Sequence, residues 1–170
     1  MTETHPFGIF VPPVTEYLFL GSFTGKVEDA SYDWFYANKR NQFWLIMKEV
    51  YGIKLGTKTE KQELFTRLNM AITDIILSCE RKANSNLDMN LTNIVFNTEA
   101  ILKVIQENKI RAIYFSSRFT EKLFRMEFKE IVSRYPSTEL ITLPSPSPRY
   151  ATMSKREKIA RYIELLPKLK

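Results

Sequence analysis

Cysteine and histidine are almost absent from this sequence, and no apolar run approaches the roughly 18 residues that span a bilayer. Cys79 has no partner for an internal disulfide, and no signal sequence precedes the first motifs, so we expect a cytoplasmic protein without membrane contact. The lack of clustered Cys and His residues argues against a structural zinc site. A Ser-His-Asp or Cys-His arrangement would have to use His5, and we do not expect one.

The composition is that of a folded, basic protein. Hydrophobic residues make up 44% of the chain and aromatic residues 13%, which excludes a disordered chain. A length of 170 residues favours a single domain over 1–170. Residues 1–100 hold 10 Lys and Arg against 12 Asp and Glu, whereas residues 101–170 hold 15 against 7. This concentrated positive charge suits a polyanion such as nucleic acid, although lysine-rich surface helices would give the same count.

The stretch Tyr36–Trp44 combines aromatic residues, amides and cations within nine positions. Aromatic rings can stack on bases, amides can hydrogen-bond base edges or hold a water molecule, and Lys39 and Arg40 can contact phosphate. The alternative is that Phe43 and Met47, which are one helical turn apart, belong to the buried start of a helix.

Hydrophobic periodicity predicts alternating strands and helices. Strands are expected over 17–21, 71–79, 111–116 and 138–143, and helices over 41–51, 59–68, 98–108, 117–135 and 155–166. Thr59 is expected to cap the second helix in a capping box with Gln62, and 83–93 is expected to be a surface loop. This alternation predicts a parallel sheet covered on both faces, with the loops that follow the strands gathered at one edge. Ligands bind at that edge in such folds.

Two of these loops have unusual compositions. The loop 21–26 has two glycines that allow close backbone approach, but its spacing matches neither a P-loop nor a dinucleotide fingerprint. The loop 143–150 has three alternating prolines, which predicts a stiff extended segment inside the domain, although a rigid linker or a proline-rich ligand is the alternative. Asp74 interrupts a predicted strand, and a buried acid needs a partner.

An ordered set of stretches resembles the uracil-DNA glycosylase superfamily. They are His5-Pro6-Phe7…Phe10…Pro12, Gly21-Ser-Phe-Thr-Gly25, Tyr36-x4-Asn41-x-Phe43-Trp44, Ser78-Cys-Glu-Arg81 and Leu143-Pro-Ser-Pro-Ser-Pro148. The set is most similar to hypoxanthine-DNA glycosylases with a Gly-Ser-Phe-Pro-Gly type first motif. The resemblance implies a three-layer α/β/α fold with a central four-stranded parallel sheet. It also implies a monomer without metal or cofactor that flips hypoxanthine or uracil from bacterial-type nucleoid DNA and hydrolyses the N-glycosidic bond in base excision repair.

The sequence departs from the family at three positions. Phe23 stands where the first motif usually has a water-activating Asp or Asn, and Thr24 replaces the usual proline. Leu143 stands where the final motif often has a histidine that contacts the base. In the similar hypoxanthine enzymes the asparagine before x-Phe-Trp is catalytic, which points to Asn41.

The resemblance thus assigns Asn41 as the residue that positions water, with Asp74, Glu80 and Asn38 as further candidates. The base pocket is expected to comprise Gly21, Ser22, Phe23, Tyr36, Asn38, Asp74 and Glu80. DNA contacts are expected from Lys26, Lys39, Arg40, Arg118, Ser145, Ser147, Arg149 and Tyr150. The serines would bind phosphates, while Arg149 and Tyr150 would enter the gap left by the flipped base. The alternatives are a non-catalytic nucleic-acid-binding relative and an unrelated pocket function such as small-nucleoside hydrolysis.

Overall fold

The computed structural model describes residues 1–24, 31–82 and 87–169. The strands are β1 (Thr2–Thr4), β2 (Tyr17–Gly21), β3 (Met70–Asp74), β4 (Ile76–Arg81), β5 (Leu91–Phe96), β6 (Ala112–Phe115) and β7 (Glu139–Thr142). The helices are α1 (Phe43–Tyr51), α2 (Lys58–Arg67), α3 (Thr98–Glu107), α4 (Arg118–Glu127), α5 (Lys129–Arg134) and α6 (Lys155–Leu165), with a 3₁₀ turn η1 (Asp88–Asn90) before β5. None of the helices within these ranges has the length and hydropathy of a bilayer-spanning segment.

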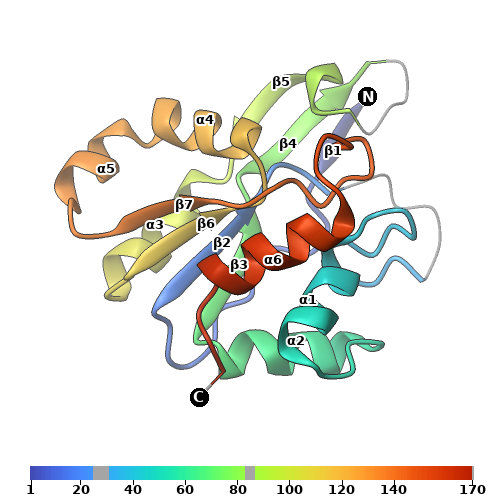
Figure 1. Ribbon diagram of the computed structural model, residues 1–170. Helices are drawn as coiled ribbons and strands as arrows, with labels where there is room; N and C mark the ends of the chain where they lie inside the picture. The colour runs from blue at the N-terminus through green and yellow to red at the C-terminus, as the bar shows by residue number, and fades with distance from the viewer. Residues whose placement is uncertain (25–30, 83–86, 170) are drawn as a thin grey trace.

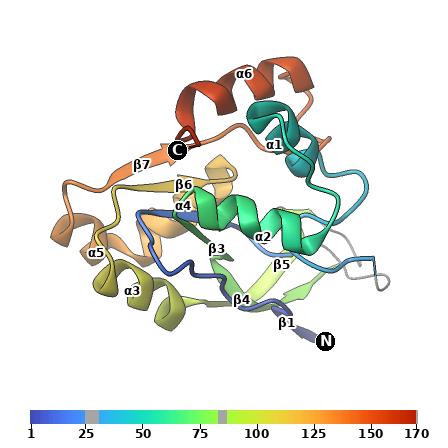
Figure 2. The same ribbon diagram turned by 90° about the horizontal axis from the view of Figure 1, so that it is seen from below.

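A parallel four-stranded sheet forms the middle layer, in the order β3-β2-β6-β7. Because successive residues of a strand point to opposite faces, β2 divides its side chains between two cores. Phe19 packs with α1, α2 and α6, whereas Leu18 and Leu20 pack with α3, α4 and α5. Figures 1 and 2 show these two groups of helices on opposite faces of the sheet. The predicted three-layer α/β/α fold is therefore confirmed.

A second, antiparallel sheet in the order β1-β4-β5 was not predicted. The single strand expected over 71–79 was wrong, because the chain bends at Ile75, whose N–H donates to the Gly21 carbonyl at 2.8 Å. The segment before the bend stays in the central sheet and the segment after it forms β4. The loop expected over 83–93 was also wrong at its end, since β5 begins at Leu91. β-Branched residues favour strands but do not indicate which sheet a strand joins.

Two helix boundaries also differ from the prediction. The capping box of α2 uses Thr57 and Glu60, where the Thr57 hydroxyl accepts from Glu60 N–H at 3.1 Å and the Glu60 carboxylate accepts from Thr57 N–H at 3.0 Å. Thr59 and Gln62 have the same spacing, so the sequence offered two candidates and the structure uses the earlier one. The single helix expected over 117–135 is divided at Phe128, which has a non-helical ψ of 31°.

The capping assignment predicts different effects for two neighbouring threonines. Thr57→Ala should lower the free energy of unfolding by about 1 kcal/mol, because the Glu60 N–H loses its acceptor. Thr59→Ala, at an exposed helical position, should change it by less than about 0.5 kcal/mol. Urea denaturation of both variants checks this. A larger loss for Thr59→Ala would show that the helix begins later.

Candidate functional site

The carboxyl ends of the parallel strands lie at one edge of the central sheet (Figure 1). Gly21 ends β2, Asp74 ends β3, and Ser116 directly follows β6. Their alignment follows from the parallel register, which pairs Gly21 with Asp74 across neighbouring strands. This edge is where open α/β sheets bind ligands, and the polar groups found there define the candidate site.

A buried pair of Asp74 and His5 lies at this edge. Their side chains are 4% and 1% exposed, and His5 Nε2 lies 2.7 Å from Asp74 Oδ2. His5 Nδ1 accepts the N–H of Phe7 at 3.2 Å, so the ring proton is on Nε2 and is donated to the carboxylate. Asp74 thus has the partner that its burial requires. Sequence reasoning missed that His5 is this partner, although it is the only histidine available to serve as one.

Tyr36 adds a hydroxyl to the same place. A Cβ atom at Gly21 would collide with both the Tyr36 hydroxyl and Asp74 Oδ1, so these two oxygens converge over a residue without a side chain. The hydroxyl is buried and has no hydrogen-bond partner among the described residues. Burial and the nearby charge of Asp74 raise the pKa of Tyr36 well above its ordinary value, while the Ser116 side chain, which is near the hydroxyl but forms no hydrogen bond of good geometry with it, acts in the opposite direction.

The backbone and ring of Tyr36 are held firmly in this position. Its φ of 58° is in the left-handed region, which non-glycine residues rarely adopt. Its ring stacks on Phe43 with centroids 4.3 Å apart and meets the edge of Phe19 at 6.3 Å. A strained backbone together with a buried hydroxyl that lacks a protein partner is typical of a functional site rather than of a core tyrosine.

Side chains from the first loop and from the second sheet extend the site. Phe23 is half-buried, with its ring 5.9 Å from His5 and the Arg81 guanidinium 5.3 Å above it. Ser22 donates to Asp88 Oδ1 at 2.9 Å, and burial raises the pKa of the Asp88 carboxyl. Phe23 therefore offers a partly exposed aromatic surface beside His5, and its ring cannot hold a water molecule.

The loop 143–150, called the proline-containing loop below, is attached to the start of α1 by a buried lysine. Lys158 is 1% exposed, and its Nζ donates to Gln42 Oε1 at 2.9 Å and to the Ser147 carbonyl at 3.1 Å. The Gln42 N–H donates in turn to the Pro146 carbonyl at 2.9 Å. Burial lowers the pKa of Lys158. Sequence reasoning missed Lys158, because a lysine in a charged helix shows no local sign of burial.

Asn41 lies next to this attachment. Its Oδ1 accepts the N–H of Phe43, the first residue of α1, at 2.9 Å, and its side chain is half-buried. Asn38 Oδ1 similarly accepts the Arg40 N–H at 2.9 Å. Both amide oxygens therefore shape the backbone that leads into α1, and Asn41 adjoins Gln42, which contacts the proline-containing loop. The catalytic role of Asn41 stays a prediction.

The other residues predicted for the base pocket and for DNA contacts lie in several parts of the structure. Glu80 lies on β4 in the second sheet, where its carboxylate accepts from Asn93, so the structure does not bring it to Asp74. Ser145 and Ser147 accept backbone N–H groups two residues further along the loop, each at 3.2 Å. The exposed residues are Lys39, Arg40, Arg118, Arg149 and Tyr150, and Lys26 lies outside the described residues.

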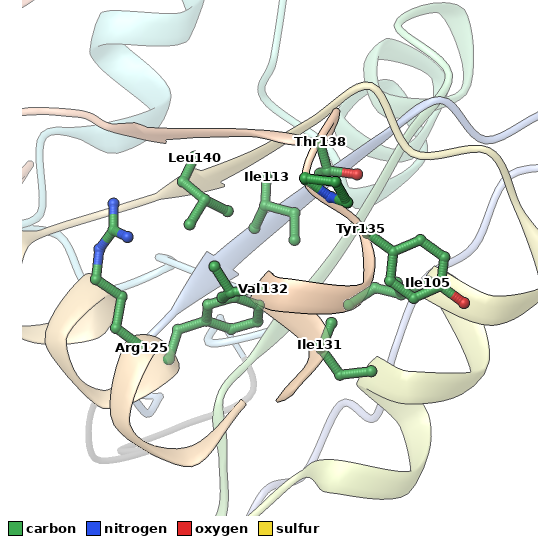
Figure 3. Close-up of a pocket in the computed structure, with 10 residues that line it drawn as sticks. Ile105, Ile113, Arg125, Ile131, Val132, Tyr135, Thr138 and Leu140 are labelled. Carbon is green, nitrogen blue, oxygen red and sulfur yellow. The ribbon is translucent and has the colours of Figure 1, made fainter. Parts of the chain in front are cut away.

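A separate hollow of about 420 Å³ opens between α3, α5, β6 and β7 (Figure 3). Its walls are mainly aliphatic, and Figure 3 shows Ile113, Val132 and Leu140 around the same space. None of the predicted site residues lines it. Without convergent polar groups this hollow is not the candidate site.

No protein-family model matches the chain, and no curated protein matches it. Among solved structures, the chain is similar to the solution structure of a "putative Uracil DNA glycosylase from Methanosarcina acetivorans". The two are 22% identical, with a TM-score of 0.69 over 97% of this chain and 99% of the other. This similarity shows that the chain has a uracil-DNA glycosylase-like fold.

The two buried tyrosines of this region should respond differently to loss of the hydroxyl. Tyr36→Phe should leave the free energy of unfolding unchanged or raise it by up to about 1 kcal/mol, because that hydroxyl has no partner among the described residues. Tyr162→Phe is the matched control and should lower it by about 1 kcal/mol, because its hydroxyl donates to the Pro144 carbonyl at 3.2 Å. Thermal and urea unfolding measure both changes. A clear loss for Tyr36→Phe would mean that its hydroxyl stabilises the fold.

Proposed function

We propose that this protein, as a single domain over 1–170, is a monofunctional DNA glycosylase that removes hypoxanthine or uracil in base excision repair. It would act as a cytoplasmic monomer on DNA, without metal or cofactor. The observation that carries the proposal is the convergence of Asp74 Oδ1 and the Tyr36 hydroxyl over Gly21, at the ligand-binding edge of a uracil-DNA glycosylase-like fold.

The chemistry of this oxygen pair suits the N–H and carbonyl edge of uracil and hypoxanthine, an edge that thymine and guanine also present. Uracil and hypoxanthine both have a ring N–H next to a carbonyl. An ionised Asp74 accepts from the N–H, and the Tyr36 hydroxyl donates to the carbonyl. Adenine and cytosine have a ring nitrogen lone pair at the corresponding place, which a carboxylate repels. Phe23 would stack on the flipped base, since its ring is partly exposed beside His5, the partner of Asp74.

Hydrolysis breaks the bond between the base nitrogen and C1′ and joins a water oxygen to C1′. The departing base takes up a proton, and the water loses one. We assign the orientation of this water to Asn41, next to the loop that would hold the DNA strand. An amide is uncharged and accepts a proton poorly, so turnover should be slow. The negative charge of Asp74 would stabilise the oxocarbenium-like sugar that forms in between.

DNA would lie across the proline-containing loop and the start of α1. Lys39, Arg40 and Arg149 are exposed there. Lys158 attaches the loop to α1, so these cations keep a fixed spacing. A rigid basic surface beside a small pocket suits the binding of a strand from which one nucleotide is flipped.

A non-catalytic DNA-binding protein is the second candidate. Phe23 and the 2% exposed Leu143 cannot position water, and the Asn41 oxygen is already bonded to a backbone N–H. A protein that had lost the reaction but kept the basic surface would have these features.

Cleavage of labelled oligonucleotides tests the proposed reaction. Each oligonucleotide carries one uracil, hypoxanthine or xanthine, and alkali breaks the strand at any abasic site. The wild-type protein should release at least one of these bases, and Asn41→Ala should reduce the rate by about 100-fold, because the water loses its orienting group. Asp74→Asn should reduce discrimination against adenine and cytosine, because an amide can donate as well as accept. No cleavage of any base, with DNA binding intact, would favour the second candidate.

Salt dependence of DNA binding tests the proposed surface. Arg149→Gln should weaken binding and reduce the slope of log K against log salt by about 0.9, since one phosphate contact is lost. Arg111→Gln is the matched control, because Arg111 is exposed and precedes β6 at the opposite edge of the sheet. Fluorescence anisotropy at several salt concentrations measures both slopes. Equal changes in the two variants would contradict this placement of DNA.

A further inference from the structure

We infer that His5 is a positioning residue, which engages one oxygen of the Asp74 side chain and directs the other to the space over Gly21. This arrangement is a property of the fold. Its effect on catalysis rests on the proposed function.

The ring of His5 is fixed from several directions. Its backbone N–H donates to the Leu77 carbonyl at 2.8 Å, and Nδ1 accepts the Phe7 N–H at 3.2 Å. The rings of Phe7, Phe23 and Phe35 lie 5.9, 5.9 and 5.3 Å from it. With Nδ1 occupied as an acceptor, only Nε2 can carry the proton, and it points at Asp74 Oδ2. The histidine therefore supplies a donor in one fixed direction.

This donor fixes one oxygen of Asp74. A buried carboxylate needs a hydrogen-bond donor, and His5 Nε2 supplies one to Oδ2 at 2.7 Å. Tyr36 and Asp88 also lie close enough to interact electrostatically with Asp74. Within the part of the chain that the structure describes, neither side chain makes a hydrogen bond to it, so His5 is the side chain that holds the acid.

The orientation of Asp74 follows from the same contact. Oδ2 is bound to His5, so Oδ1 is the oxygen left over Gly21 and next to the Tyr36 hydroxyl. An ionised Oδ1 accepts the N–H of uracil or hypoxanthine. A protonated Asp74 would present a donor there and would reject the same edge. By fixing which oxygen faces Gly21, His5 therefore determines which base edges the pocket accepts.

Two substitutions of His5 separate this role from simple packing. His5→Gln keeps an N–H that can reach Asp74, whereas His5→Leu fills the space without a donor. His5→Leu should reduce kcat/KM by about 10- to 100-fold and weaken the preference for uracil and hypoxanthine over adenine and cytosine, because Asp74 Oδ1 is no longer held over Gly21. His5→Gln should restore most of the activity and the preference. Phe7→Leu, which alters packing against the same ring, should leave the preference in place.

An unchanged base preference in His5→Leu, or equal behaviour of the Gln and Leu variants, would overturn the inference.

A second measurement does not depend on activity. Because His5 is the only histidine, ¹⁵N NMR of the protein without a histidine tag reports one imidazole. The Nε2–H tautomer should be present at pH 7, and Asp74→Asn should shift the Nε2 resonance. An Nδ1–H tautomer would overturn the inference even in an active enzyme. The expected tautomer in a protein that releases no base would uphold the positioning of Asp74 and refute the glycosylase reaction.

Discussion

The close approach of two oxygens to Gly21 is the constraint on which the candidate site depends. A Cβ atom there would displace both the Asp74 carboxylate and the Tyr36 hydroxyl. The parallel register places Asp74 beside Gly21, and the left-handed backbone of Tyr36 directs its ring into the same space. An acceptor and a hydroxyl are thereby presented at one point of the sheet edge.

Several unfavourable features gather around this edge. The Tyr36 hydroxyl has no partner among the described residues, and the amine of Lys158 is bound to neutral oxygens of Gln42 and Ser147. By contrast, the hydroxyl of Tyr162 in the same region donates to the Pro144 carbonyl, and that of Tyr114 donates to the Leu165 carbonyl. Strain and incomplete satisfaction at one edge, beside a well-paired core, are what a site prepared for a ligand shows.

Two long-range contacts assemble the site from distant parts of the chain. His5 comes from the segment after β1, which pairs with the second sheet, and reaches the end of a strand in the first. Lys158 comes from α6 and joins the start of α1 to the proline-containing loop. The first contact fixes the Asp74 side chain, and the second fixes the proline-containing loop. Residues adjacent in the sequence would not hold either of them in place. The antiparallel sheet, which was not predicted, is what brings His5 within reach of Asp74.

The parallel sheet, most helices and the loops that follow the strands could be predicted from the sequence, because these depend on periodicities of two and of 3.6 residues. The prediction chose Thr59 as the helix cap where the structure uses Thr57, did not indicate the bend at Ile75, and grouped Glu80 with Asp74 although the structure places them in different sheets. The assembled fold was needed to pair His5 with Asp74, 69 residues apart, and Lys158 with Gln42, 116 residues apart. The periodicity of hydrophobic residues indicates which face of a helix or strand is buried. A pairing between distant polar groups depends instead on how these faces are assembled in space.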